Sequence, residues 1–246
     1  MSAEAAIVVD SLGFTYPDGK VALADISFRA DVGESIGLVG PNGAGKTTLF
    51  LCLAGVLRVP PGRIRLAGLD PGNPAERRRM PLRVGIVFQN SDDQLFNATV
   101  GDDVAFGPLN LGLPADEVRR RVTEALERVG LAGFEERVPM HLAGGEKRRA
   151  ALAGVLAMRP DVLLLDEPSM FLDPRGRREL IALLHRLGGT RIVAAHDLDL
   201  ILDTCTRVLV IDGGRLVADG PATTALADAE LMERHGLEVP YRMRRA

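Results

Sequence analysis

Cysteine and long apolar runs are scarce in this chain of 246 residues. Only two cysteines occur, Cys52 and Cys205, and each lies in an apolar stretch far from a second ligand. The sequence therefore predicts neither a disulfide framework nor a zinc site, and it fits a reducing compartment. The longest apolar runs, 49–57 and 150–158, are much shorter than the roughly 18 residues of a membrane-spanning helix. We expect no membrane span.

An excess of charge of one sign is also missing. The 30 basic and 33 acidic residues give a net charge of −3. No global positive field would hold DNA or RNA by counterion release, so nucleic acid is not expected as a partner. Residues 1–6 lack the basic and long apolar regions of a secretory signal, and we expect the chain to stay in the compartment where it is made.

The composition that remains is that of an ordinary globular protein, with 46% apolar and 26% charged residues. Before residue 40, two short alternating runs, Ala6–Val9 and Ile26–Ala30, flank a Pro-Asp-Gly turn, which predicts an antiparallel β-subdomain. Further along, continuous apolar runs separated by helical stretches indicate the buried strands of a parallel sheet. These runs are Ser35–Val39, Val84–Phe88, Val162–Leu165, Arg191–Ala194 and Val208–Ile211.

The stretch between the second and third of these runs has a helical pattern instead. Its apolar side chains recur on one helix face opposite a charged face. We therefore predict a single domain, with a helical subdomain at about 90–159 inserted into a core and β-subdomain at about 1–89 and 160–246. An Asp-Gly-Gly sequence at 212–214 predicts a hairpin near the end. The apolar face consists of Val118, Val122, Ala125, Leu126 and Val129.

A glycine-rich loop follows the strand Ser35–Val39 and precedes the apolar run 49–57, which we predict to be a helix. The loop fits G-x-x-x-x-G-K-[ST] in the strand-to-helix context that this phosphate-binding motif requires. Its backbone N–H groups and the helix N-terminus would face phosphate oxygens. Lys46 would reach the β- and γ-phosphates, and the Thr47 hydroxyl would bind Mg²⁺. The loop consists of Gly40, Pro41, Asn42, Gly43, Ala44, Gly45, Lys46, Thr47 and Thr48.

Two carboxylates come directly after the strand Val162–Leu165. Open α/β sheets bind their ligands at the carboxyl ends of strands. Asp166 therefore suits the shell of a Mg²⁺ ion, and Glu167 suits the orientation or deprotonation of an attacking water. Alone this pattern is a weak signal, but downstream of a phosphate-binding loop it is specific.

Four further motifs stand in a fixed order with these two, and together they resemble the nucleotide-binding subunit of ATP-binding cassette (ABC) transporters. The resemblance covers essentially the whole chain. It implies an α/β P-loop ATPase core with a mixed or parallel sheet, an N-terminal antiparallel β-subdomain and an inserted helical subdomain, which binds ATP and Mg²⁺ and hydrolyses ATP. The four motifs are Gln89, Leu142–Glu146, Ser169–Asp173 and His196.

The resemblance assigns roles to three residues outside the loop. Tyr16 would stack on adenine, and a tyrosine packed at a strand end is the alternative. Gln89 would ligate Mg²⁺ or hold the attacking water. His196 would hydrogen-bond to the γ-phosphate. With Lys46 and Glu167, Gln89 and His196 complete the implied catalytic set.

The signature motif that the resemblance identifies consists of Ala143, Gly144, Gly145 and Glu146 at the start of a predicted helix ending at Met158. The N-terminal amides of this helix would form a second anion site. In the family this site closes over the ATP of the opposite subunit, and Asp173 lines the shared boundary, which implies a homodimer or a heterodimer with a paralogue. Ala143 replaces the serine usual in the family, and Phe171 replaces a small residue.

Residues 84–96, 103–113 and 147–158 are similar to the ATPases of energy-coupling-factor importers, including the cobalt and nickel group, although Ser91 departs from the usual proline. In those systems a helix of a transmembrane coupling protein docks beside the Gln89 loop, and a substrate-binding membrane protein selects the cargo. The similarity implies a peripheral position on the cytoplasmic face of the membrane and import of cobalt or nickel. A vitamin importer, for example for biotin, and a weakly active regulatory subunit are the alternatives.

Other classes of protein use the same cassette without a membrane. DNA-repair and chromosome ATPases carry long coiled-coil or zinc insertions, and translation factors carry two cassettes with a basic linker. The 246 residues contain neither feature, so the sequence does not favour these classes.

Overall fold

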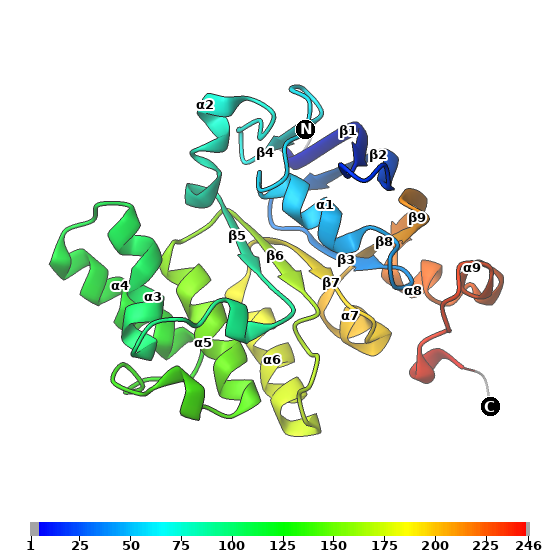
Figure 1. Cartoon of the computed structure of the whole chain (residues 1–246). Coiled ribbons are helices and arrows are strands. Elements are labelled where there is room, and N and C mark those ends of the chain that lie inside the picture. Colours follow the sequence, from blue (N-terminus) through cyan, green and yellow to red (C-terminus); the bar gives the residue numbers. More distant parts are fainter. Residues whose placement is uncertain (1–4, 245–246) are drawn as a thin grey trace.

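The computed structural model of the protein describes residues 5–244, which form two β-sheets with helices between and around them (Figure 1). Residues 1–4, part of the segment considered as a secretory signal, and residues 245–246 lie outside the described residues. Within residues 5–244, every helix is too short or too polar to cross a membrane.

The smaller sheet is antiparallel, as the sequence predicts, with the strand order β2-β1-β4. Both long strands extend beyond the alternating runs from which they were predicted. The third strand was missed, because three residues are too few to show a periodic pattern. The strands are β1 (Ala5–Thr15), β2 (Val21–Asp31) and β4 (Ile64–Leu66).

The larger sheet has the order β5-β6-β7-β3-β8-β9. The first five strands in that order are parallel, and their apolar side chains are buried on both faces, which explains the continuous apolar runs. The hairpin predicted at 212–214 adds β9 antiparallel to β8. All five predicted strands are confirmed to within one or two residues. They are β3 (Ser35–Val39), β5 (Val84–Val87), β6 (Val162–Asp166), β7 (Thr190–Ala194) and β8 (Arg207–Asp212), followed by β9 (Arg215–Pro221).

Helix α1 (Lys46–Leu53) lies between the two sheets (Figure 1). Its buried side chains, among them Phe50 and Leu53, join one hydrophobic core with residues of both sheets. The prediction that this helix runs to Leu57 was wrong. The helix stops because Gly55 adopts a φ of +74°, a left-handed conformation that glycine tolerates and that ends helices.

A second core fills the opposite face of the larger sheet and continues into the helices between β5 and β6. There α4 (Ala115–Arg128) buries the predicted face, and Val129 is buried just beyond its end. The signature helix α5 (Gly144–Ala157) packs against α3 (Val100–Asn110) and α4. The remaining elements are α2 (Pro74–Arg77), η1 (Met80–Leu82), η2 (Ser91–Asp93), η3 (Pro139–His141), α6 (Pro174–Leu187), α7 (Leu198–Thr204), α8 (Ala222–Ala225), α9 (Ala229–Arg234) and η4 (Tyr241–Met243).

Both cysteines are free and buried in these cores. Burial raises the pKa of the Cys52 thiol to about 12 and also raises the pKa of Cys205. Both thiols therefore remain protonated near neutral pH.

Candidate active site

A cleft of about 920 Å³ opens at the carboxyl ends of β3 and β6. It collects most of the predicted site residues from segments far apart in the sequence. The phosphate-binding loop supplies one wall, and the residues after β5, β6 and β7 supply others. The predicted residues that line the cleft are Tyr16, Asn42, Gly43, Ala44, Gly45, Lys46, Thr47, Thr48, Gln89, Asp166, Glu167 and His196.

The loop before α1 has the form that an anion site needs. Gly45 has a φ of +108°, and a Cβ atom there would lie 2.6 Å from the Ala22 carbonyl oxygen, so only glycine fits. No side chain caps the N-terminus of α1. The N–H groups of its first turn are therefore available to phosphate oxygens, and the helix dipole adds positive potential.

Lys46 is a buried cation at the centre of the cleft. Its Nζ donates to the carbonyl oxygens of Gly40 at 2.6 Å and Pro41 at 3.2 Å, which are the first two residues of the loop. Burial lowers the pKa of Lys46, and the charges of Glu167 and Asp166 oppose that shift. The ammonium group is thus held beside the loop, where phosphate oxygens would meet it.

Thr47 and Asp166 form a pair of oxygen ligands. The Thr47 hydroxyl donates to Asp166 Oδ2 at 2.8 Å, and Asp166 is buried at the end of β6. Burial raises the pKa of Asp166, while the Thr47 hydrogen bond and the Lys46 charge lower it. A hydroxyl and a buried carboxylate are hard oxygen ligands of the kind that Mg²⁺ uses together with phosphate oxygens, so this pair fits the expected ion.

Glu167 has one buried carboxylate oxygen that remains available. Its Oε2 accepts from the backbone N–H of His196 at 3.1 Å, whereas Oε1 is buried without a hydrogen bond among the described residues. Burial raises the pKa of Glu167, since the hydrogen bond from His196 and the Lys46 charge offset it only in part. The backbone φ of +48° is strained for a glutamate, and such strain gathers at functional positions.

The His196 side chain lies beside both Lys46 and Glu167. Its Nε2 is 3.5 Å from Lys46 Nζ and 3.5 Å from Glu167 Oε1. Burial and the neighbouring Lys46 charge lower the pKa of His196, so the neutral imidazole is favoured at pH 7. A neutral imidazole can donate one hydrogen bond to a phosphate oxygen without adding a second charge.

Gln89 lines the cleft two residues beyond β5, but its side chain contacts neither Thr47 nor Asp166. Its Nε2 donates to the Met170 sulfur at 2.8 Å. Its backbone is held by Arg148, which donates to the carbonyl oxygens of Phe88 at 2.7 Å and of Gln89 at 2.6 Å. The predicted role of Gln89 toward Mg²⁺ or water therefore requires a different rotamer.

Sequence reasoning missed the part that Arg148 plays. It is a buried charged residue on α5, and its charge acts on both Asp166 and Glu167. In the sequence Arg148 stands in the charged run 146–149, just before the apolar run of α5, so no local signal distinguishes it from a solvated arginine. Sequence reasoning also missed a pair across the cleft, in which Arg177 binds Asp197 through two hydrogen bonds. These two residues are twenty positions apart, and no local pattern connects them.

Tyr16 stands at the outer end of the cleft, where its hydroxyl lies 3.0 Å from Thr48 Oγ1 and its ring meets the edge of Phe14. The signature residues Ala143, Gly144, Gly145 and Glu146 do not line this cleft, and neither does Asp173. Asp173 caps α6 by accepting from the Gly176 N–H, and Glu146 accepts from the Ala143 N–H.

A phosphate-binding loop, a hydroxyl hydrogen-bonded to a buried carboxylate, and a second carboxylate on a largely parallel sheet define a P-loop nucleotide hydrolase. Residues 23–170 match the ABC transporter family. The chain belongs to this family. It is an ATP-binding ATPase that energises a transporter, as the resemblance implied.

Known relatives match nearly the whole chain. A Gloeobacter violaceus protein named as an ABC transporter ATP-binding protein is 54% identical, and the match covers 97% of this chain and 98% of the relative. The energy-coupling factor transporter ATP-binding protein EcfA of Methanothermobacter thermautotrophicus is 46% identical, with 95% and 76% covered. The structure of cbiO1 from Clostridium perfringens, described as part of the ABC transporter complex cbiONQ, has 38% identity and a TM-score of 0.83, with 94% of each chain covered.

Proposed function

We propose that this ATPase energises an importer of the energy-coupling-factor type, with cobalt or nickel ions as the cargo. The observation that supports the coupling type is the similarity over nearly the full length of this chain to EcfA, which is named as an energy-coupling factor transporter protein. The similarity to cbiO1, described as part of the ABC transporter complex cbiONQ, adds to it. The cargo rests on sequence resemblance alone. There are two alternative functions. One is to energise the import of a vitamin such as biotin, and the other is that of a weakly active regulatory subunit.

The first step is the capture of ATP in the cleft. Tyr16 stacks on adenine, the amides of residues 42–48 surround the phosphates, and Lys46 exchanges its carbonyl partners for β- and γ-phosphate oxygens. Thr47, Asp166 and a rotated Gln89 are the residues that would hold Mg²⁺. When bound, Mg²⁺ supplies charge neutralisation at the phosphates.

The second step is the attack of water on the γ-phosphate. Glu167 Oε1 is buried and has no competing hydrogen bond from residues 5–244, so it can accept the proton of a water held near it. The raised pKa makes Glu167 a stronger base than an exposed glutamate. His196 donates to the γ-phosphate from the opposite side, while Lys46 neutralises the developing negative charge.

The third step needs a second subunit. The signature residues 143–146 lie outside the chain's own cleft, so we propose that they close over the ATP of a partner, either a second copy or a paralogue. The backbone amides at the start of α5 would bind the γ-phosphate there. Asp173 lies at the start of α6, beside the exposed Phe171, and would line the boundary.

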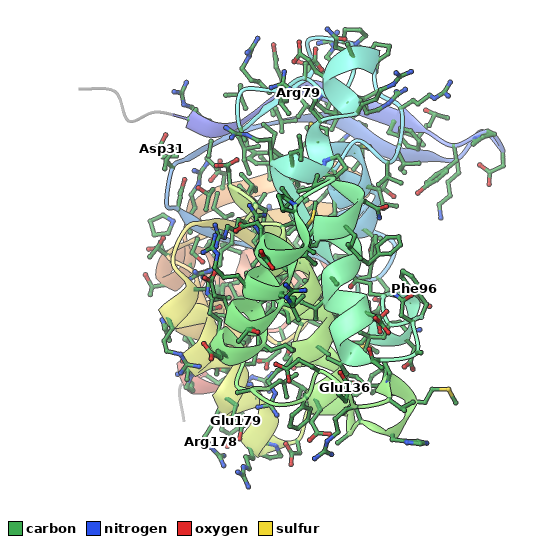
Figure 2. All side chains as sticks on the ribbon, turned by 90° about the vertical axis from the view of Figure 1, so that its left-hand side faces the viewer. Asp31, Arg79, Phe96, Glu136, Arg178 and Glu179 are labelled. Carbon is green, nitrogen blue, oxygen red and sulfur yellow. The ribbon has the colours of Figure 1, made fainter. Side chains whose placement is uncertain are left out.

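A groove of about 340 Å³ between β5, α3 and α5 would receive the transmembrane coupling protein. Phe96 and Phe106 line it and are 61% and 48% exposed. Their rings meet edge to face, with 5.1 Å between the ring centroids (Figure 2 labels Phe96). Within the groove, Asp103 Oδ2 is buried without a hydrogen bond among the described residues. An apolar helix with one hydrogen-bond donor would fit this groove, because the donor would give Asp103 Oδ2 a partner.

This docking would place the chain on the cytoplasmic face of the membrane, with a coupling protein and a separate substrate-binding membrane protein as partners and without nucleic acid. The division into a helical subdomain at about 90–159 and a core at about 1–89 and 160–246 would let Gln89 pass the state of the nucleotide to the groove.

The deciding experiment is reconstitution of the chain with the membrane proteins that co-purify with it. We expect ATP hydrolysis to rise on assembly and labelled cobalt or nickel to enter vesicles only with ATP. Glu167→Gln is the matched control, because it should assemble without transport. Biotin uptake instead of metal uptake would select the vitamin alternative. Hydrolysis that does not respond to any membrane partner would select the regulatory one.

A further inference from the structure

Arginines accumulate in one segment of a chain that is otherwise acidic. Residues 58–83 contain seven arginines and two carboxylates, whereas the whole chain has a net charge of −3. Both carboxylates are engaged locally, since Asp70 accepts from the Gly62 and Gly72 amides and Glu76 accepts from the Asp70 amide. We call these seven residues the arginine patch: Arg58, Arg63, Arg65, Arg77, Arg78, Arg79 and Arg83.

The charge of the arginine patch is largely uncompensated. Six of its members are exposed and Arg77 is half-buried. Across residues 5–244, Arg83 is the only member that forms an ion pair, at 2.8 Å from Asp161. Arg65 and Arg83 both turn toward the Ala67–Gly68 turn, where they donate to carbonyl oxygens. Guanidinium groups gathered in this way repel one another unless an anion lies among them.

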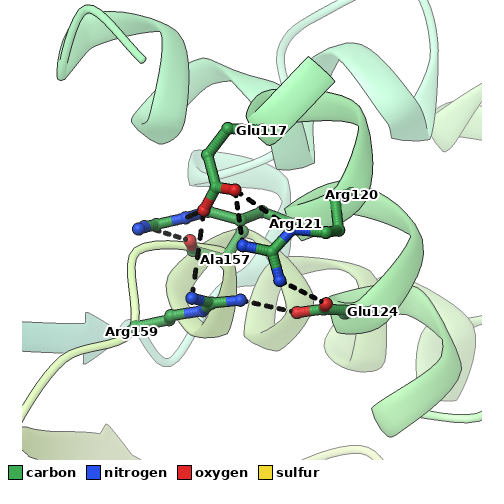
Figure 3. A network of polar contacts seen from close by, with 6 residues as sticks. All are labelled: Glu117, Arg120, Arg121, Glu124, Ala157 and Arg159. Atoms are coloured by element: carbon green, nitrogen blue, oxygen red, sulfur yellow. Dashed lines mark hydrogen bonds and ion pairs between the residues drawn. The ribbon is translucent and has the colours of Figure 1, made fainter. Parts of the chain in front are cut away.

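A second cluster of arginines in the chain is paired with carboxylates. On the outer side of α4 and α5, Arg120, Arg121 and Arg159 interleave with Glu117 and Glu124 in a closed network (Figure 3). Hydrogen bonds from Arg121 and Arg120 lower the pKa of Glu117 to about 2, so this network stays ionised. The clustered arginines of this network thus have carboxylate partners, whereas six of the seven in the patch form no ion pair among the described residues.

The arginine patch borders the groove proposed for the coupling protein. Arg79 and Arg83 flank η1, whose Pro81 lines that groove, and the chain then enters β5 at the edge of the larger sheet. In Figure 2, Arg79 lies at the top of the molecule and Phe96 on its flank, whereas Arg178 and Glu179 lie at the bottom. The patch and the groove therefore adjoin each other at η1.

We propose that the arginine patch binds the anionic lipid headgroups around the membrane partner. The inference rests on the proposed function, because docking in the groove is what turns the β5 edge toward the bilayer. Guanidinium groups bind phosphate oxygens in pairs of hydrogen bonds, and the negative potential of the cytoplasmic leaflet attracts clustered basic residues. The patch would bind the leaflet directly while the groove holds the protein partner.

The test is flotation of the full chain with vesicles of phosphatidylcholine, with and without phosphatidylglycerol. We expect binding only to the anionic vesicles, and weaker binding as salt shortens the screening length from about 10 Å at 0.1 M. Arg77→Gln/Arg78→Gln/Arg79→Gln should lower the partition coefficient on the order of a hundredfold, because each basic residue at such a surface contributes about fivefold.

The matched control is Arg128→Gln/Arg178→Gln/Arg186→Gln. It removes the same charge from three exposed arginines that form no ion pair within the described residues, and it should keep vesicle binding. Equal loss in both triple variants, or no preference for phosphatidylglycerol, would overturn the proposal. Binding of polyuridylate at least as tight as vesicle binding would instead make the patch a nucleic-acid surface.

Stimulation of ATP hydrolysis by the membrane partners in detergent separates this inference from the proposed function. If stimulation is absent while vesicle binding follows the pattern above, the partner assignment fails and the lipid surface stands. If stimulation occurs and vesicle binding does not, only the lipid surface fails.

Discussion

At the scale of single residues, the adjacent carboxylates after β6 differ in what their oxygens contact. Asp166 accepts the Thr47 hydroxyl, whereas Glu167 keeps one buried oxygen without a hydrogen bond among the described residues. The first arrangement suits a ligand that stays in place, and the second suits a group that takes up a proton. Substitution of residues around this pair should therefore separate binding from chemistry.

Lys46→Ala should abolish ATP binding, because it removes the only buried ammonium group among the described residues that line the cleft. Glu167→Gln should keep ATP binding and lower hydrolysis by about a hundredfold or more, since the amide cannot accept the proton. Calorimetry with ATP and phosphate release measure the two effects. Unchanged phosphate release in Glu167→Gln would remove that residue from the catalytic set.

Glu167→Gln should also stabilise the chain when nucleotide is absent. A carboxyl whose pKa is raised on folding holds its proton more tightly in the folded state, so it lowers the folding stability as pH rises from about 4.5 through the raised value. At pH 7, which is above 4.5, this cost is present, and the glutamine removes it. Thermal unfolding should show a midpoint a few degrees higher, with the gain shrinking as pH falls toward 4.5. Glu127→Gln, at an exposed position on α4, should show no such gain.

The sequence alone was sufficient to predict the position of residues that directly follow a predicted strand. The loop 40–48 and the pair Asp166 and Glu167 follow strands directly, so their place at the sheet edge could be derived. The contacts of Arg148 and of Arg177 could not, because they depend on how separate helices pack. The rotamer of Gln89 toward Met170 likewise follows from a loop contact that no motif encodes.

At the scale of elements, the signature helix α5 is tied to the segment after β5 at two points. Arg148 donates to the carbonyl oxygens of Phe88 and Gln89, and Lys147 pairs with Asp92 at 2.7 Å. A movement of Gln89 toward bound nucleotide would therefore pull directly on α5. Strand and helix existence followed from periodicity, but this tie and the short strand β4 have no periodic signal.

Arg148→Gln should lower kcat about tenfold and leave the KM for ATP nearly unchanged, because Arg148 donates to the segment after β5 and not to the loop at 40–48. The pH–rate profile should also move to higher pH. The positive charge of Arg148 lowers the pKa of Asp166, so removing that charge should raise this pKa further. Arg148→Lys should restore part of kcat, because an ammonium can still donate to carbonyl oxygens.

The control for Arg148 is Arg121→Gln, on α4, whose side chain contacts the other end of α5. Arg121 donates to Glu117 of α4 and to the Ala157 carbonyl oxygen of α5, so this variant also loses an arginine hydrogen bond to α5 (Figure 3). It should reduce stability without changing kcat or the pH profile. Equal loss of kcat in both variants would show that Arg148 acts only through folding.

At the scale of the whole molecule, one chain provides a complete cleft on one side and a signature helix that does not reach it. From this arrangement we expect hydrolysis to depend on a second subunit. Ala143 has no hydroxyl to offer across such a boundary, although the amides at the start of α5 remain. We expect ATP to promote a weak dimer, and the Glu167→Gln variant to accumulate it.

Ala143→Ser should tighten the ATP-dependent dimer about tenfold to a hundredfold, because a hydrogen bond to a charged group contributes roughly 1.5 to 3 kcal/mol. Turnover should rise most at low protein concentration. Sedimentation and ATP hydrolysis across a range of protein concentrations measure both effects. Coincident curves for the parent and the variant would mean that the exposed Phe171 leaves no room for the hydroxyl to act.

The two buried thiols make this chain well suited to distance measurements. Cys52 and Cys205 lie inside the hydrophobic cores, and their raised pKa values keep them from forming thiolate at neutral pH. Maleimide reagents react with thiolate, so the native chain should remain unlabelled. A single cysteine introduced on the exposed surface of α6 would then carry a fluorophore or spin label specifically. Subunit closure can thus be followed by energy transfer or electron spin resonance without first removing any native residue.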